Sequence, residues 1–279
     1  MILVAGARGN VGRCVVQQLL AAGEQVRALT RDPASAHFPE EVEVVRGDLA
    51  DAATLGPAFP GVERMFFFTP EKGGPEAVEA ARRAGVRRLV LLSSAATQKA
   101  DPRSNPISAR HDAVEKAVQA AGLAWTFLRP DSFAANALAW ATTIRAHGVV
   151  RAAYPHTLRN PVDESDIAAV ATTALLDERH IGSAYLLTGP ALISQMQQVE
   201  AIAAAIGTAV RFEELSREQA LSEMSQRMPT AIALKLLDYM AKSVHTPPLV
   251  TADVERVLGR AARPFAQWAH DHAEAFRRR

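Results

Sequence analysis

The chain has 279 residues, of which 31 are Lys or Arg and 30 are Asp or Glu, so its formal net charge is +1. With 48% hydrophobic and 22% charged residues, the composition is typical of a soluble globular protein and excludes a disordered or fibrous chain. General nucleic-acid binding requires an excess of clustered Lys and Arg, so no nucleic-acid partner is expected.

Cys14 is the single cysteine, so no disulfide forms within the chain, which suits a reducing cytoplasm. Met1 is followed directly by apolar residues, without a basic leader and cleavage site. No apolar run reaches the roughly 18 residues that a membrane-spanning helix requires. We therefore expect a cytoplasmic protein without a membrane partner.

The first half of the chain alternates short β-branched runs with longer amphipathic segments. This alternation is typical of parallel βαβ units and predicts an α/β fold with a Rossmann-type doubly wound parallel sheet. The six expected strands are residues 2–5, 25–29, 42–46, 64–68, 87–92 and 124–128. The expected helices are residues 11–20, 50–59, 75–84 and 108–121. Gly23, Gly85 and Gly122 each stand between a helix and a strand, where a left-handed glycine ends a helix.

Beyond about residue 148 the pattern indicates a smaller, α-rich C-terminal lobe. Its expected strands are residues 149–153 and 185–188, and its expected helices are residues 165–176, 195–206, 217–228 and 230–243. Thr251 or Asp253 is expected to cap a further helix, and Pro264 leads into another. We predict one domain over residues 1–150 and a second over residues 151–279, partly interleaved with the first.

A glycine pattern of the form GxxGxxG separates the first expected strand from the first expected helix. In that context it predicts a loop that binds the pyrophosphate of a dinucleotide through free N–H groups at a helix N-terminus. Gly6 permits a tight turn, Gly9 lets the backbone approach the phosphates, and Gly12 lets the helix pack closely on the sheet. The alternative is a tight turn without a ligand. The predicted cofactor-binding loop residues are Gly6, Arg8, Gly9, Asn10, Val11 and Gly12.

The residues after the second strand indicate which dinucleotide binds. A site for NAD usually has a carboxylate there for the ribose 2′-hydroxyl, whereas this chain has Thr30 and Arg31, with Asp32 just beyond. The Arg31 guanidinium can hold a 2′-phosphate, and Arg8 can add a second contact. We therefore predict that NADPH is preferred over NADH. The alternative is that Arg31 pairs at the surface with Asp32 or Glu40.

Motifs over nearly the whole chain resemble those of the NmrA-like family of atypical short-chain dehydrogenases/reductases. This group includes NADPH-dependent quinone oxidoreductases and triphenylmethane reductases. The matching segments are residues 6–12, 47–49, 68–70, 93–94, 111–116, 122–130, 162–168 and 265–269. The resemblance implies that Asp48 accepts a hydrogen bond from the adenine amino group. The alternative is that Asp48 only caps the N-terminus of the helix near Ala50. The further cofactor contacts that the resemblance implies are Leu49, Thr69, Pro70 and Ser93.

The catalytic residues of the wider superfamily, a Tyr and a Lys four residues later on one helix, are absent. His111 and Glu115 stand at the matching places, and Lys116 lies about 100° round the helix from Glu115. This arrangement resembles that of the quinone oxidoreductases, in which hydride transfer is thought not to need the Tyr. His111 and Lys116 are therefore the candidate catalytic residues, with a neighbouring carboxylate favouring the charged, proton-donating form of His111. The alternative is a surface histidine paired with Asp112 or Glu115, and a solvated Lys116.

The segment 131–136 is expected to start a helix, which in the family passes beside the nicotinamide. Phe133 and Asn136 are thus candidates for substrate binding, and Trp140 and Tyr154 can complete an aromatic wall for a planar acceptor. The alternative for each is ordinary core packing. No metal-ligand cluster is expected.

The function predicted from these features is hydride transfer from NADPH to a small planar acceptor such as a quinone or a conjugated carbonyl. We expect the protein to act on a small molecule as a monomer or homodimer. A second interpretation is an NmrA-like regulator that senses NAD(P) without turnover, because the Tyr is absent. A third is an isomerase similar to the nucleotide-sugar epimerases, which ranks last because that chemistry normally needs the same Tyr.

Overall fold

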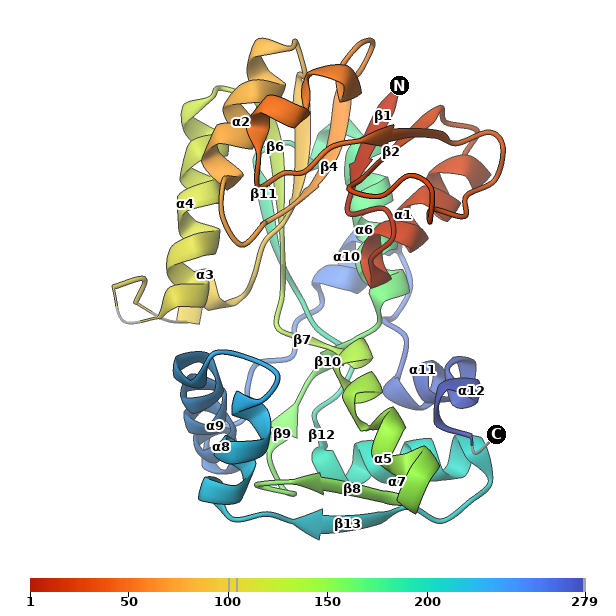
Figure 1. Ribbon diagram of the computed structural model, residues 1–279, viewed down its shortest axis with the longest axis vertical. Helices are drawn as coiled ribbons and strands as arrows, with labels where there is room; N and C mark the ends of the chain where they lie inside the picture. Colours follow the sequence, from red (N-terminus) through yellow and green to blue (C-terminus); the bar gives the residue numbers. More distant parts are fainter. Residues whose placement is uncertain (100, 104, 278–279) are drawn as a thin grey trace. The chain divides into compact units, whose positions relative to one another are not determined.

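A parallel sheet of seven strands organises the first part of the chain (Figure 1). The computed structural model describes residues 1–99, 101–103 and 105–277. The strand order is β11-β6-β5-β4-β1-β2-β3, and all neighbouring pairs are parallel. The strands are β1 (Ile2–Ala5), β2 (Val26–Thr30), β3 (Glu43–Arg46), β4 (Arg64–Phe68), β5 (Arg88–Leu92), β6 (Ala124–Pro130) and β11 (Ser183–Leu187). The order reverses between β1 and β4, as in a Rossmann-type doubly wound sheet, so the predicted fold class is confirmed.

The seventh strand corrects the expected count of six. The run near Tyr185 was assigned to the C-terminal lobe, but as β11 it pairs with β6, from Ser183 beside Thr126 to Leu187 beside Pro130. The apolar pattern of a strand indicates burial without indicating its partner, because pairing between distant segments is decided by tertiary packing.

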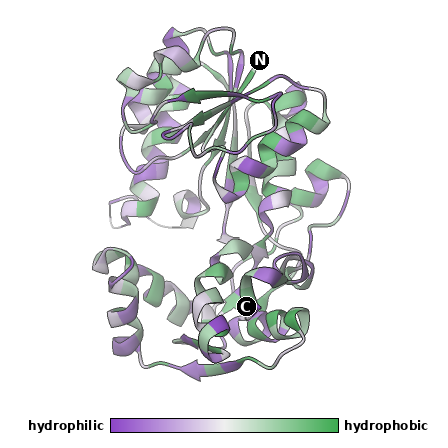
Figure 2. Ribbon diagram, turned by 45° about the vertical axis from the view of Figure 1, so that its right-hand side comes forward, coloured by the Kyte–Doolittle hydropathy of each residue, from purple (hydrophilic) through white to green (hydrophobic). Residues whose placement is uncertain are grey.

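Helices cover both faces of the sheet (Figure 1). On one face α1 (Asn10–Ala21) packs against α6 (Glu164–Leu176), and on the other α2 (Gly74–Arg83) packs against α4 (Pro106–Ala120). The short helix α10 (Asp253–Leu258) packs against α6 and β11. Two further short helices are α3 (Ala96–Lys99) and the 3-10 helix η4 (Glu178–His180). The strands are coloured mostly as hydrophobic in Figure 2, as expected for strands with both faces covered.

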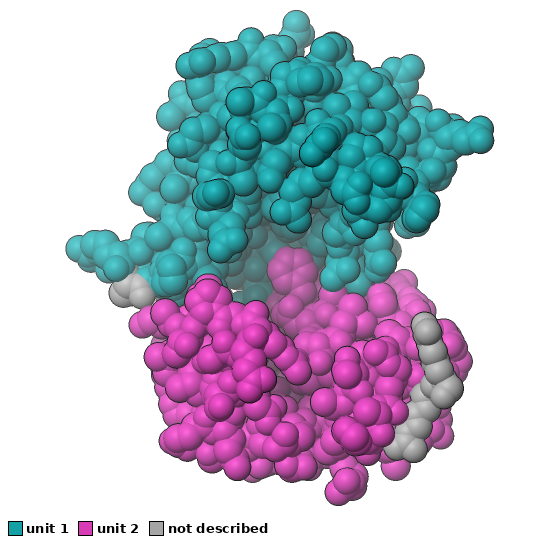
Figure 3. Space-filling model, viewed as in Figure 1, with its two compact units in different colours: residues 1–131, 164–187, 253–260 teal, residues 132–163, 188–252, 261–279 magenta. Residues whose placement is uncertain are grey.

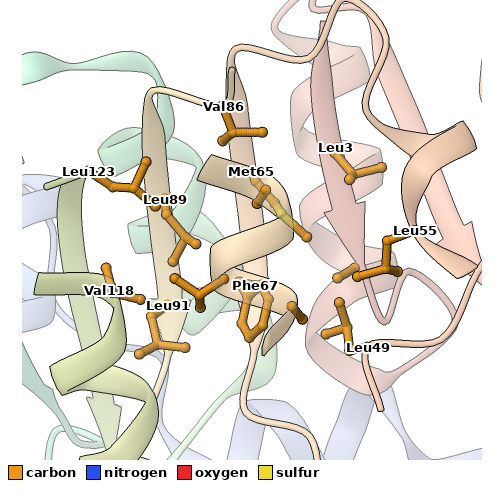
Figure 4. Packing of buried hydrophobic residues seen from close by; sticks show 14 of the residues in the cluster. Leu3, Leu49, Leu55, Met65, Phe67, Val86, Leu89, Leu91, Val118 and Leu123 are labelled. Carbon is orange, nitrogen blue, oxygen red and sulfur yellow. The ribbon is translucent and has the colours of Figure 1, made fainter. Parts of the chain in front are cut away.

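The main core lies between the sheet and the helices α2 and α4 (Figure 4). Alternate residues of the strands point into it because side chains along a strand alternate between the two faces. Burial of each large apolar side chain there stabilises the fold by ~1.5–3 kcal/mol. Labelled members of this cluster are Leu3, Leu49, Leu55, Met65, Phe67, Val86, Leu89, Leu91, Val118 and Leu123.

Two local expectations are wrong and one is confirmed. The helix expected over residues 50–59 consists of two short 3-10 helices, η1 (Ala52–Thr54) and η2 (Gly56–Ala58). Pro57 explains the interruption, because proline has no N–H for the helical ladder. The segment 131–136 starts with the strand β7 (Ser132–Phe133) and continues as the 3-10 helix η3 (Ala134–Trp140). The predicted left-handed glycines are confirmed, with φ of 78° at Gly23, 92° at Gly85 and 67° at Gly122.

The rest of the chain forms small two-stranded sheets and helices around separate cores. Paired strands are β10 (Pro161–Val162) with β7, β12 (Ile193–Ser194) with β9 (Leu158–Arg159), and β13 (Arg211–Glu214) with β8 (Val149–Ala152). The helices are α5 (Ala141–His147), α7 (Gln195–Ile206), α8 (Arg217–Ser225), α9 (Thr230–His245), α11 (Phe265–Asp271) and α12 (Ala273–Phe276). The fully buried Trp268 stacks on Phe265, with ring centroids 5.1 Å apart, and anchors the larger of these cores.

The chain divides into two compact units whose segments alternate along the sequence (Figure 3). Unit 1 comprises residues 1–131, 164–187 and 253–260, and unit 2 comprises residues 132–163, 188–252 and 261–279. Residue 150, at which the sequence analysis divides the chain, lies in unit 2. Among the described helices, none combines the length and the apolarity needed to cross a membrane.

Candidate functional site

The predicted cofactor contacts outside the glycine loop gather at the carboxyl ends of the strands of unit 1. Arg31 directly follows β2, Asp48 follows β3 by one residue, Thr69 follows β4 and Ser93 follows β5. The glycine loop, residues 6–12, joins β1 to α1. Doubly wound sheets bind their ligands at this edge, near the point where the strand order reverses. The topology therefore brings the predicted contacts to one edge of the sheet.

The glycine loop is packed so closely that no side chain fits at Gly6 or Gly12 without a shift of the neighbouring atoms. Gly6 has φ 66°, and a Cβ there would lie 2.8 Å from the ring of Phe68. A Cβ on Gly12 would lie 2.1 Å from the carbonyl oxygen of Gly6. The backbone N–H of Gly9 donates to the same carbonyl at 2.8 Å. Gly12 is thus required by the loop itself, whereas the sequence analysis expected its close contact with the sheet.

The first turn of α1 presents N–H groups that find no acceptor among the described residues. The N-cap residue Gly9 has no side chain to accept them, and the first turn holds no acidic residue. The ladder of α1 starts with the N–H of Arg13, which donates to Gly9 at 3.0 Å. The N–H groups of Asn10, Val11 and Gly12 therefore point out of the helix end, where its dipole is positive. This arrangement fits a diphosphate group.

A small polar cluster lies beside the loop at the end of β2. Arg8 donates from Nη1 to the Ser35 hydroxyl at 2.7 Å, and Ser35 also hydrogen bonds the Asp32 carboxylate. The Ser35 hydroxyl, with a smaller contribution from the Arg8 charge, lowers the pKa of Asp32 below its usual value. In the part of the chain that the structure describes, Arg31 is exposed and makes no ion pair with Asp32 or Glu40. The expected position of a 2′-phosphate is thus bordered by two guanidinium groups and one carboxylate.

Asp48 shapes the turn after β3. Its Oδ1 accepts from the N–H of Ala50 at 2.9 Å, while its own N–H donates to the hydroxyl of Thr54 at 2.9 Å. The N-cap of η1 is Asp51, which accepts from the N–H of Ala53 at 3.2 Å. One oxygen of the Asp48 carboxylate therefore stabilises the turn after β3. Its predicted contact with adenine stays a prediction.

Ser93 belongs to a buried polar network with α4 and β6. The Ser93 hydroxyl donates to Glu115 Oε1 at 2.5 Å. Arg129 holds the same carboxylate bidentately, from Nε to Oε1 at 2.9 Å and from Nη2 to Oε2 at 2.6 Å. Ser93 is 3% exposed and Glu115 6% exposed. The sequence predicts Glu115 on a helix and Arg129 at the end of a strand, but no local pattern pairs the two residues.

His111 lies one turn before Glu115 on α4, and it is neutral near pH 7. Burial, with a smaller contribution from the charge of Arg110, lowers its pKa to about 4. Glu115 is engaged by Arg129, and Asp112 pairs with Lys116 at 2.7 Å, so no neighbouring carboxylate pairs with His111. The expected charged, proton-donating imidazole is therefore wrong. Its Nδ1 is buried and has no hydrogen-bond partner among the described residues.

Lys116, the other candidate catalytic residue, lies on the solvated side of α4. Its side chain is 72% exposed, and its ammonium group forms the ion pair with Asp112, four residues earlier. An exposed pair of this kind contributes little to stability, typically about 0.3–0.5 kcal/mol. A catalytic role for Lys116 stays a prediction.

The predicted substrate-binding residues all belong to unit 2. Phe133 in β7 is half-buried, Asn136 in η3 is exposed, and Trp140 packs against the core that contains Trp268. Tyr154 is the only described non-glycine residue with positive φ, at 58°. Its carbonyl accepts from Thr157 and Gln195, and its hydroxyl accepts from Arg217 at 3.4 Å. Such backbone strain is often found at functional sites, and the contact of these residues with a substrate stays a prediction.

The side chains that could hold a metal ion were compared over residues 1–99, 101–103 and 105–277. No group of three or more His, Cys, Asp or Glu side chains in these ranges is arranged to hold an ion.

The doubly wound sheet and the glycine loop define the class of a dinucleotide-binding protein. A family model described as NAD(P)H-binding matches residues 6–178. The chain belongs to this family, as an NmrA-like member of the atypical short-chain dehydrogenases/reductases.

Two relatives match almost the whole chain. A (4-alkanoyl-5-oxo-2,5-dihydrofuran-3-yl)methyl phosphate reductase of Streptomyces griseus is 39% identical over 281 residues, 99% of each chain. An NAD(P)H azoreductase of Xenophilus azovorans is 35% identical over 294 residues, again 99% of each. Among solved structures, the Escherichia coli NADPH-dependent quinone oxidoreductase QOR2 complexed with NADPH matches with a TM-score of 0.81 at 23% identity. That match covers 97% of this chain and 99% of the other, and it supports the fold.

Proposed function

We propose that the protein is an NADPH-dependent reductase that delivers hydride to a small planar acceptor with a conjugated carbonyl group or a quinone ring. The observation that carries this proposal is the glycine loop with the open first turn of α1, which fits a dinucleotide pyrophosphate. The names of the two relatives, both reductases, support reduction as the reaction.

The direction of the cofactor follows from the order of the strands. With the pyrophosphate on the loop after β1, Arg31 and Asp48 at the ends of β2 and β3 would hold the adenosine half. Thr69 and Ser93, at the ends of β4 and β5 on the other side of β1, would line the nicotinamide half. His111, one turn before Glu115 on α4, belongs to this second half.

NADPH is the proposed cofactor because Arg31 is an exposed guanidinium without an ion pair in the described chain. A guanidinium that is already paired would have to break that contact, whereas Arg31 is available to a phosphate. Arg8 lies beside the same position and is held there by Ser35.

The chemistry that NADPH would supply here is a hydride, a proton with two electrons, for transfer to the acceptor. The chain binds and orients the cofactor through the loop N–H groups and the two arginines. At pH 7 a neutral His111 holds one ring proton and lacks the second proton of an imidazolium. The proton that completes the reduction is therefore proposed to come from solvent.

The acceptor class is suggested by the names of the relatives. The dihydrofuranone of the Streptomyces griseus enzyme has a ring double bond conjugated with carbonyl groups, and azo compounds are likewise planar and conjugated. Phe133, Asn136, Trp140 and Tyr154 of unit 2 are the proposed substrate-binding residues.

The test is to incubate the purified protein with NADPH and a panel of quinones, unsaturated lactones and azo dyes, and to follow the absorbance of the reduced nicotinamide. Steady oxidation with at least one acceptor is expected. Tight NADPH binding without oxidation across the panel would overturn the reductase and favour the second candidate, a regulator that senses the cofactor. The absence of a tyrosine from α4 is the observation that favours this candidate.

We also propose that the protein works in the cytoplasm as a monomer or homodimer, on a small molecule. Its single cysteine suits that compartment. Fractionation of the source cells tests the location, and finding the protein outside the cytoplasm would overturn it. Light scattering of the purified protein tests the oligomeric state, and an assembly larger than a dimer would overturn it.

A further inference from the structure

A buried ion pair lies under the part of the sheet edge to which we assign the nicotinamide. Glu115 and Arg129 are joined at 2.6 Å, with side chains only 8% and 17% exposed. The carboxylate of Glu115 also accepts the Ser93 hydroxyl, at the end of β5. Arg129 lies near the end of β6, so the pair connects two neighbouring strand ends with α4.

Stability alone does not account for such a pair. Taking two charges out of water costs several kcal/mol per ion, and well-packed apolar residues of similar volume are often as stable or more stable. A net-neutral pair, however, has a distinct electrostatic property. It produces little field as long as both members are present, whereas loss of one member leaves a full charge in a poorly screened place.

We propose that the Glu115–Arg129 pair balances the affinity of the site for the oxidised and the reduced cofactor. This inference rests on the proposed function. The reduced nicotinamide ring is uncharged, and the oxidised ring carries a positive charge. A neutral pair below the ring treats both states nearly alike, so neither product release nor cofactor binding is penalised. Glu115 is then a positioning residue that also cancels the charge of Arg129.

The sign of the effect follows from which charge is left. In Glu115→Gln the guanidinium of Arg129 stays positive, because arginine does not deprotonate in proteins. It repels the oxidised ring and has no charge to repel in the reduced one. The ratio of the dissociation constants, Kd for NADP⁺ over Kd for NADPH, therefore rises. We expect a rise of about threefold to tenfold for a charge within ~10 Å in a partly screened site.

Three further variants separate charge from structure. Glu115→Asp keeps the charge but shortens the side chain, so its ratio stays near that of the wild type. The double variant Glu115→Gln with Arg129→Gln removes both charges, and its ratio returns toward the wild-type value. Arg129→Gln alone leaves the carboxylate, and its ratio falls. This last variant also tests the proposal if Glu115→Gln does not fold.

Binding of both cofactors is measured by calorimetry at fixed salt, with thermal unfolding as the check on folding. An unchanged ratio in Glu115→Gln, or equal ratios in the two single variants, would overturn the role of the pair while leaving the reductase in place. A wild-type protein that binds neither cofactor would overturn the proposed function itself, and this inference with it.

Discussion

The two halves of the sheet edge in unit 1 differ in whether their polar groups have hydrogen-bond partners within the protein. Around β1 and β2 the groups are open, since the N–H groups of the first turn of α1 and the guanidinium of Arg31 have no protein acceptor in the described chain. Around β5 and β6 the polar groups satisfy one another, as in Ser93, Glu115 and Arg129. The first half is prepared for an anion, and the second is nearly neutral. The difference indicates that one set of residues determines the affinity for the cofactor and another determines the electrostatic environment of its nicotinamide ring.

The largest expected effect is at the open half. Gly12→Ala places a methyl group where only 2.1 Å separates it from the carbonyl oxygen of Gly6, so the loop must move. We expect NADPH affinity to fall at least ~100-fold, because the loop N–H groups no longer converge on the pyrophosphate. Calorimetric titration with NADPH measures the loss. Gly56→Ala, at a glycine with open space around it, is the matched control. Wild-type affinity in Gly12→Ala would show that the loop does not hold the cofactor.

Arg31→Ala tests which group at this half selects the cofactor. Loss of a charge-assisted contact with the 2′-phosphate is expected to weaken NADPH binding about 10- to 100-fold and to leave NADH binding unchanged. Titrating the variant with both cofactors gives the answer. Arg87→Ala removes an exposed arginine that precedes β5, at the opposite edge of the sheet, and serves as the control. Equal affinities of the wild type for NADPH and NADH, unaffected by Arg31→Ala, would end the assignment.

The half around β5 and β6, in which the polar groups satisfy one another, is called the closed half. It is tested through the titration of His111. Its pKa in the folded protein, about 4, lies below the unfolded value near 6.5, so the unfolded chain binds the proton first. Stability that His111 contributes at pH 7 is therefore lost as the pH falls from about 6.5 toward 4. We expect wild type to lose ~1–2 kcal/mol more than His111→Gln over this range.

Urea unfolding of both proteins between pH 7 and pH 4.5 measures this difference. Parallel curves would mean that the pKa of His111 is the same in the folded and the unfolded protein, which would restore it as a candidate proton donor.

The smallest expected effect concerns the carboxylate beside the two arginines. Asp32→Asn removes a negative charge from the expected position of the 2′-phosphate, so NADPH binding should strengthen by about two- to fivefold, with NADH binding unchanged or weaker. The effect should shrink in high salt, because Asp32 is exposed. Glu40→Gln, also exposed, is the control. Weaker NADPH binding in Asp32→Asn would instead make this carboxylate part of the cofactor site.

The open half could be predicted from the sequence, and the closed half could not. Gly6, Gly9 and Gly12 are close in the chain, and their spacing carries their geometry. The strand ends likewise follow from local apolar patterns. Glu115 and Arg129, by contrast, meet through packing of α4 on the sheet, and no local pattern encodes that contact. The sequence suggested a charged His111 because the burial that lowers its pKa comes from tertiary packing, which a local pattern does not show.

Ser35 is a residue of the half around β1 and β2 that no sequence motif indicated. It contacts both Arg8 and Asp32, although Arg8 is 27 residues away along the chain. Position just beyond β2 was the available signal, because residues there lie at the same edge as the glycine loop.

Because segments of the two units alternate along the chain, unit 1 cannot be completed early in synthesis. Synthesis from the ribosome delivers β1 to β6 first, yet α6 and β11 follow only at residues 164–187, and α10 only at residues 253–260. Until then the exposed apolar face of α1 lacks the helix that covers it, and β6 is an open sheet edge, which is prone to pair with other chains. A fragment that stops at residue 150 would keep both defects. Unit 1, which carries the NAD(P)H-binding loop, is therefore not an independently folding domain. Its folding depends on nearly the full length of the chain.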